Sequence, residues 1–123
     1  MTELEILEYE GDGYDATMNF GEWRVAIANY IDDFDREKCT RLERHLKTDE
    51  VFVLLWGKAT LITGLDMKET PMETGKLYNV KLGVWHALFM DRGSKVLIVE
   101  EDSTSEENSE FHYFKEKHGG FYK

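Results

Sequence analysis

The sequence predicts a single all-β domain, folded as a β-sandwich or barrel, and three observations lead to this prediction. The 123 residues match the usual size of one domain, and such a chain buries roughly two-thirds of the surface that it exposes when unfolded. Apolar and aromatic residues come in short runs rather than at helical spacing. Glycine and aspartate turns separate these runs, and many short strands at near-regular spacing are typical of sandwiches and barrels.

Seven segments are expected to form strands because they are short and rich in Val, Ile, Leu and aromatic residues, which suit the surface of a sheet. In chain order they are Arg24–Ile31, Val51–Trp56, Ala59–Thr63, Leu77–Leu82, Trp85–Met90, Lys95–Glu100 and Glu110–Phe114. Turn sequences such as Gly57-Lys58 and Asp91-Arg92-Gly93 lie between them. Only Asp33–Lys38 is compatible with a turn of helix, and no longer amphipathic helix is predicted.

The charge balance limits the kinds of partner. The chain has 15 Lys and Arg against 25 Asp and Glu, which gives a net charge of −10. No cluster of Lys and Arg is available to neutralise phosphates, so a nucleic-acid partner is not expected, and an anionic membrane surface would repel the protein. The longest apolar run, Val51–Trp56, is far shorter than the ~20 residues of a membrane-spanning helix. A small-molecule or protein partner is therefore expected.

Cysteine usage and the N-terminus predict a cytoplasmic protein. The single cysteine, Cys39, excludes a disulfide framework within the chain and agrees with a reducing compartment. The first residues, Met-Thr-Glu-Leu-Glu-Ile-Leu-Glu, are acidic, whereas a signal peptide begins with a basic segment.

Six residues stand in an ordered pattern that carries the functional information. The pattern is His-x4-Glu-x6-Gly followed by Gly-x7-Gly-x2-His. Its members are His45, Glu50, Gly57, Gly75, Gly83 and His86. The first half alone is a weak signal, and the ordered combination of both halves is much more specific.

This spacing resembles the two motifs of the cupin superfamily, G-x5-H-x-H-x3–4-E-x6-G and G-x5-P-x-G-x2-H-x3-N. The resemblance covers residues 37–90 directly. The chain departs from it at four positions: Glu37 replaces a glycine, Glu43 the first histidine, Lys81 the proline and Met90 the asparagine. Glu43 and Lys81 fall at the candidate site or its rim. The activity of other cupins therefore cannot be transferred to this chain together with the fold.

The resemblance implies a cupin-type double-stranded β-helix, which is a jelly-roll barrel, of roughly eight to ten strands. We expect one cupin domain over residues 1–123. Its barrel would span about residues 20–115, flanked by an N-terminal strand and a C-terminal tail.

The motif residues predict a metal site. Alternation along a strand places Glu43 and His45 on one face, Glu50 begins the next strand, and His86 comes from a third. Two histidines and a carboxylate suit a divalent transition metal, namely iron, manganese, nickel or zinc, with positions open to substrate. We predict His45, Glu50 and His86 as ligands. Glu43 is either a fourth ligand or the partner of Arg44 in an exposed ion pair.

Three further residues are candidates for substrate binding. Arg24, Tyr78 and Lys81 are expected near the mouth of the barrel, where a cation or a phenol would orient an anionic substrate. Alternatively, these three residues are ordinary exposed residues on the surface of the strands.

The predicted function is a metal-dependent small-molecule cupin, acting as an isomerase, lyase or oxygenase on a small polar metabolite or sugar. Two alternatives stay open: a non-catalytic ligand-binding or sensing cupin, and a metal-free sugar isomerase that uses His45 and His86 as acid–base groups. Val51, Val53 and Leu55 make the strand Val51–Trp56 apolar on both faces, so a homodimer is also expected.

Overall fold

The computed structural model describes residues 3–114, 117–118 and 121–122. For residues 106, 117–118 and 121–122 the structure describes the backbone and not the side chains. The C-terminal tail expected after residue 115 therefore lies partly outside the described residues.

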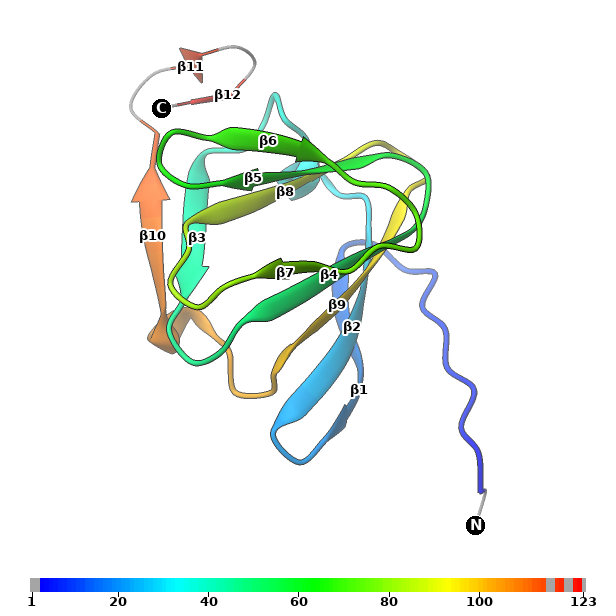
Figure 1. Ribbon diagram of the computed structural model, residues 1–123. Helices are drawn as coiled ribbons and strands as arrows, with labels where there is room; N and C mark the ends of the chain where they lie inside the picture. The colour runs from blue at the N-terminus through cyan, green and yellow to red at the C-terminus, as the bar shows by residue number, and fades with distance from the viewer. Residues whose placement is uncertain (1–2, 115–116, 119–120, 123) are drawn as a thin grey trace.

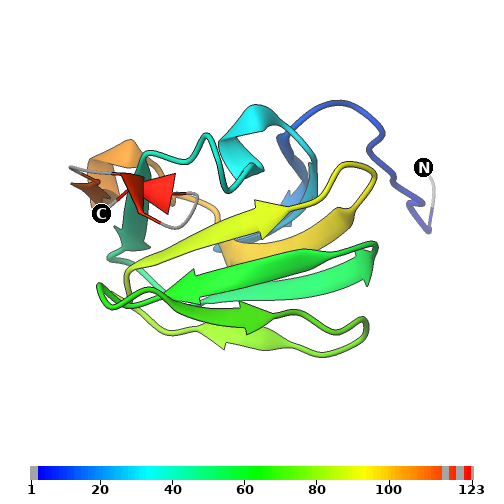
Figure 2. The same cartoon turned by 90° about the horizontal axis from the view of Figure 1, so that it is seen from above.

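Ten strands form two antiparallel five-stranded sheets that face each other as a jelly-roll barrel (Figures 1 and 2). The first sheet has the order β1-β2-β9-β4-β7 and the second the order β10-β3-β8-β5-β6. The strands of the first sheet are Tyr14–Phe20 (β1), Trp23–Asn29 (β2), Lys95–Glu101 (β9), Glu50–Trp56 (β4) and Tyr78–Val80 (β7). Those of the second are Ser109–Tyr113 (β10), Arg41–His45 (β3), His86–Met90 (β8), Ala59–Thr63 (β5) and Lys68–Pro71 (β6).

Four short elements complete the described chain. Two of them, β11 and β12, pair with each other outside the two sheets. The other two are 3-10 turns, η1 and η2. Their bounds are Lys117–His118 (β11), Phe121–Tyr122 (β12), Asp32–Phe34 (η1) and Glu106–Asn108 (η2).

The all-β prediction is confirmed, and each of the seven predicted segments contains a strand. The segment Leu77–Leu82 is the least accurate, because the strand ends at Val80 where Val84 N–H donates to the carbonyl of Lys81 in a turn. The predicted helical turn at Asp33–Lys38 forms slightly earlier, as η1. Strands β1, β3 and β6 are not among the seven segments, although an N-terminal strand is expected, and Glu43 and His45 are expected together on one strand. Strands β1 and β6 are edge strands, and exposure to solvent removes the apolar run that marks a central strand.

The core fills the space between the sheets. Phe52 and Leu54 of β4 are 3% and 2% exposed, as their alternation predicts, and they pack with Ala26 of β2 and Ile98 of β9. Toward one end of the barrel the inward-facing positions of these strands change from apolar to charged residues. The change of composition places a polar site inside an otherwise apolar barrel.

Two motif glycines shape turns at opposite ends of the barrel, Gly57 after the far end of β4 and Gly83 beside the polar end. Gly57 has φ 90°, and a Cβ there would lie 2.7 Å from Ser94 Cα, so only glycine fits. Gly83 has φ 77°, and its N–H donates to the carbonyl of His45 at 3.1 Å. This bond ties the end of β3 to the turn before β8, and so brings two of the predicted ligand strands together.

None of the helices in the described part of the chain has the length and the apolar character required to span a bilayer.

Candidate metal centre

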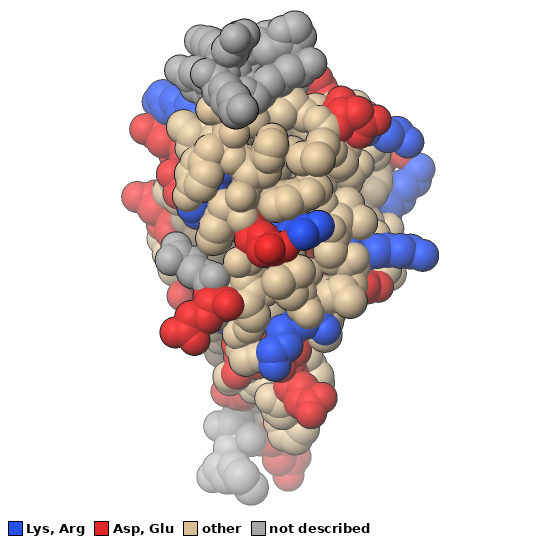
Figure 3. Space-filling view, turned by 90° about the vertical axis from the view of Figure 1, so that its left-hand side faces the viewer, with Lys and Arg blue, Asp and Glu red and all other residues tan. Residues whose placement is uncertain are grey.

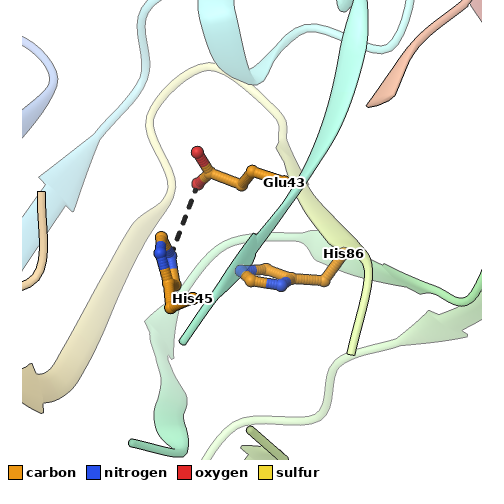
Figure 4. A group of neighbouring side chains, drawn as sticks. All are labelled: Glu43, His45 and His86. Carbon is orange, nitrogen blue, oxygen red and sulfur yellow. Dashed lines mark ion pairs between the residues drawn. The ribbon is translucent and has the colours of Figure 1, made fainter. Parts of the chain in front are cut away.

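The four predicted ligands meet at one end of the barrel and come from both sheets. Glu43 and His45 lie on β3 and His86 on β8, while Glu50 lies on β4 of the facing sheet. Glu43 is directly opposite His86 across the β3–β8 pair. Figure 4 shows Glu43, His45 and His86 pointing toward one another, with an ion pair between Glu43 and His45.

The donor atoms of these residues are close together. Glu50 Oε1 lies 3.1 Å from His45 Nε2 and 3.1 Å from His86 Nε2. Glu43 Oε1 lies 3.7 Å from His45 Nε2, and the two imidazole rings meet edge to face at 5.2 Å. His86 and Glu50 are buried, at 3% and 6% exposure, whereas Glu43 is partly exposed.

Hydrogen bonds on the far side of each ring set the protonation of the imidazoles. His86 Nδ1 lies 3.0 Å from the carbonyl of Val84, which can only accept, so Nδ1 carries the proton. His45 Nδ1 lies 2.7 Å from Ser109 Oγ. Since the Ser109 hydroxyl donates to the carbonyl of Ser105 at 2.6 Å, it accepts from His45 Nδ1. Each neutral ring therefore has its lone pair on Nε2, the arrangement that second-shell partners impose on metal-binding histidines.

The residues fit a divalent cation. Glu50 Oε1 is buried and has no hydrogen-bond partner among the described residues, although two imidazole nitrogens lie 3.1 Å away. When both rings are neutral and protonated on Nδ1, three electron-pair donors face one another in this space. A metal bound at about 2.1 Å by donors at right angles holds them about 3.0 Å apart, which matches these separations.

The electrostatics of the cluster agree with a cation site. Burial works against a charged Glu50, but the two neighbouring imidazoles outweigh it and lower its pKa to about 2. Burial likewise works against charged imidazoles, and the Glu50 carboxylate reverses this by raising the pKa of both His45 and His86. Positive charge is therefore favoured at the point that these three residues face.

A fifth residue, Glu100, belongs to the cluster and was not predicted. Val51 of β4 pairs with Val99 of β9, so one step along this antiparallel register Glu50 meets Glu100. Glu100 is 6% exposed, and a carboxylate oxygen of it lies within 4.8 Å of the ligand atoms of His45 and Glu50. Burial and the nearby Glu50 carboxylate raise the pKa of Glu100.

Glu100 is held by two residues on its other side. The hydroxyl of Tyr14 donates to Glu100 Oε2 at 2.5 Å, and Arg24 Nε donates to the Tyr14 oxygen at 2.9 Å. Arg24 Nη2 also lies 3.6 Å from Glu100 Oε1, and its remaining donors reach the carbonyls of Asp102 and Thr104. Because its guanidinium is engaged in this way, Arg24 positions Glu100.

A cavity of about 640 Å³ opens onto the cluster. Arg24, predicted at its mouth, does line it, together with all four predicted ligands. Tyr78 and Lys81 are not among the described residues that line it. Tyr78 packs against the core and its hydroxyl accepts from Glu73 N–H at 2.8 Å, while Lys81 is exposed after β7. The positions of Tyr78 and Lys81 therefore do not support a role in substrate binding.

The two alternatives for Glu43 can also be compared. Arg44 points to the other face of β3, where its Nε donates to Glu110 Oε1 at 2.7 Å and its guanidinium lies 4.5 Å from the Trp85 ring centroid. Glu43 instead faces His45 from inside the cavity. The position favours a ligand role for Glu43 over an ion pair with Arg44.

Comparisons with known proteins identify the fold. No family model matches the chain, and no curated protein matches it in sequence. Among solved structures, a cupin-2 domain protein from Shewanella frigidimarina has a TM-score of 0.59 at 16% identity, over 76% of this chain and 84% of that one.

Two other solved structures are also similar to this chain. Streptomyces PAC13 with uridine has a TM-score of 0.64 at 12% identity over 93% of both chains, and Pac13 is described as a nucleoside dehydratase. The iron(II) protein HppE has a TM-score of 0.56 at 18% identity, over 71% of this chain and 49% of that one. At these identities the likeness extends to the fold alone, and it shows that this chain has the fold of the cupin superfamily.

Proposed function

We propose that this protein is a metal-dependent enzyme that isomerises a small polar metabolite or eliminates water from it. The observation that carries the proposal is the buried Glu50 Oε1, which lies 3.1 Å from Nε2 of both His45 and His86 and has no hydrogen-bond partner in the part of the chain that the structure describes. The group lines an open cavity. His45, His86 and Glu50 would hold the metal, with Glu43 as the fourth ligand. A divalent metal in this place would polarise a carbonyl or hydroxyl oxygen of the substrate.

The donor set narrows the choice of metal. Imidazole suits iron, zinc, copper and nickel, whereas carboxylates suit manganese and magnesium. A mixed set of two imidazoles and two carboxylates is therefore most suitable for iron or manganese. The fold neighbour HppE is described as an iron(II) protein, in agreement with this assignment.

Glu100 supports proton transfer as the type of reaction. Its environment raises the pKa of Glu100, whereas the pKa of the neighbouring Glu50 is lowered. Two carboxyl groups whose pKa values differ in this way are suited to different roles in a reaction. Glu50 stays ionised at the metal, and Glu100 exchanges a proton with the substrate while Tyr14 holds it in place. In an isomerisation Glu100 removes a proton from a carbon beside a carbonyl and returns it to another atom. In an elimination the proton combines with the departing hydroxide as water.

Metal analysis and turnover together test this proposal. The purified protein, loaded with iron(II) or manganese(II), is expected to bind close to one ion per chain and to convert a member of a panel of hydroxy- and oxo-compounds. Glu100→Gln should keep the metal and lose most of the turnover, and His86→Ala should lose both. Turnover that survives complete chelation would establish the metal-free isomerase instead, and metal and ligand binding without turnover would establish the sensing module.

A further inference from the structure

One wall of the cavity is a ladder of side chains from two paired strands. Arg41, Glu43 and His45 alternate along β3, and β10 places Tyr113 opposite Arg41 and Phe111 opposite Glu43. All five line the cavity. Two residues of a strand span about 6.8 Å, so Arg41 stands about 7 Å from Glu43 and about 14 Å from His45 along the strand.

Arg41 is held in place by aromatic side chains. Its guanidinium carbon lies 4.0 Å from the ring centroid of Phe111 and 5.9 Å from that of Tyr113. Its Nη1 donates to the Tyr113 hydroxyl at 3.2 Å. Such stacking orients a guanidinium without neutralising its charge.

No carboxylate within the described residues forms an ion pair with Arg41. Three of the other four arginines do have such partners: Arg24 pairs with Glu100, Arg36 with Glu69 and Arg44 with Glu110. The fourth, Arg92, stacks on Tyr30 at 4.5 Å and does not line this cavity. Acidic residues outnumber basic ones by 25 to 15, so an arginine inside a cavity without an acidic partner has its charge available to a ligand. A planar guanidinium of this kind matches the oxygens of a phosphate or carboxylate.

The carboxylates of the metal site therefore lie at the inner end of the β3 row and Arg41 at its opposite end, and the cavity lining also includes the exposed Asp33 and Lys38. We propose that the cavity binds an anionic hydroxy- or oxo-compound, whose phosphate or carboxylate group is bound by Arg41 while its hydroxyl or carbonyl end reaches the metal centre. This inference rests on the proposed function for what happens at the inner end. The spacing of Arg41 and the ligands requires a substrate with its anionic group about 7–10 Å from the reacting oxygen, the size of a sugar phosphate or sugar acid.

Arg44 supplies a matched control on the same strand. It is also stacked on an aromatic ring, Trp85, but it lies on the outer face of β3 and is paired with Glu110. Figure 3 shows the side of the barrel that is on the left in Figure 1, where acidic and basic side chains lie among uncharged ones rather than gathering in a basic patch. Anions are therefore not expected to collect on this outer surface.

The test compares binding of charged and neutral compounds by calorimetry. The probes are ribose 5-phosphate against ribose, and gluconate against glucose. The wild-type protein is expected to bind at least one anionic member at least tenfold more tightly than its neutral counterpart. Arg41→Gln should abolish this preference, Arg41→Lys should reduce it, and Arg44→Gln should retain it. Circular dichroism melts check that all three variants fold.

Two results would overturn the inference. They are a wild-type protein with no preference for either anion, and an Arg41→Gln variant that behaves like Arg44→Gln. Repeating the titration after chelation separates this inference from the proposed function. An anion preference that depends on Arg41 in a protein that binds no metal leaves the Arg41 site standing and removes the metal-dependent reaction.

Discussion

Metal binding is expected to depend steeply on pH because it competes with protons at two imidazoles. His45 and His86 keep their Nδ1 protons in hydrogen bonds to Ser109 and Val84, so each must lose only its Nε2 proton to bind a metal. The Glu50 carboxylate raises the pKa of both rings above the ordinary value of about 6.5, so both are largely protonated at pH 5.5. Two protons released per ion give an affinity that rises by up to about 100-fold between pH 5.5 and 6.5, or up to about 2.7 kcal/mol.

The metal-free protein should show the opposite trend. A raised folded-state pKa means that the imidazole–Glu50 ion pairs stabilise the fold fully below about pH 6.5. This stabilisation is lost as the pH rises through the raised pKa values of His45 and His86. Rising pH should therefore lower the contribution of this cluster to the metal-free fold while it increases the stabilisation by added metal.

Thermal melts with and without metal measure both trends. For a domain of this size 1 kcal/mol corresponds to about 4 °C, so the increase in Tm caused by metal should itself grow by up to about 10 °C between pH 5.5 and 6.5 at a fixed excess of metal. His86→Ala is the control, because it should remove most of this dependence. A metal-induced increase in Tm that is the same at both pH values would refute the assignment of the two imidazoles as ligands.

Three other predictions concern the second shell, the core and the assembly. Ser109→Ala removes the group that accepts from His45 Nδ1 and should weaken metal binding about 10- to 100-fold by calorimetry; an unchanged affinity would mean that this bond does not orient the ring. Leu54→Ala, at a side chain 2% exposed, should cost about 2–5 kcal/mol in denaturant unfolding without changing metal affinity in the folded protein, and a parallel loss of affinity would contradict the separation of core and site. The protein should be a homodimer of 14.4 kDa chains in light scattering, since Leu4 and Ile6 are 69% and 88% exposed on a segment that leaves the barrel (Figure 1); a monomer at micromolar concentration would argue against this.

The part of the site that follows from local patterns could be predicted from the sequence. Alternation along one strand places Glu43 beside His45, and motif spacing identifies Glu50 and His86; the structure brings all four together. The same alternation indicates the inward-facing Phe52 of β4. These predictions need only the period of a strand and the distance between motif residues.

The remaining site residues depend on which strands become neighbours. Glu100 reaches the cluster because β9 lies beside β4, and Tyr14 reaches Glu100 from β1, 86 residues away in sequence. The alternation of Val96, Ile98 and Glu100 predicts that Glu100 faces inward, but only the pairing of β9 with β4 places it at the metal site. The proposed role of Arg41 likewise depends on Phe111 and Tyr113 of β10. Local sequence does not specify that β10 pairs with β3.

Anomalous diffraction from crystals of the metal-loaded protein tests the central claim most directly. Data collected at the absorption edge of manganese or iron should show one strong peak at the end of the barrel, within about 2.0–2.3 Å of His45 Nε2, His86 Nε2 and Glu50 Oε1. Crystals grown with saturating metal that show no peak among these atoms, or a peak only elsewhere on the chain, would contradict the assignment.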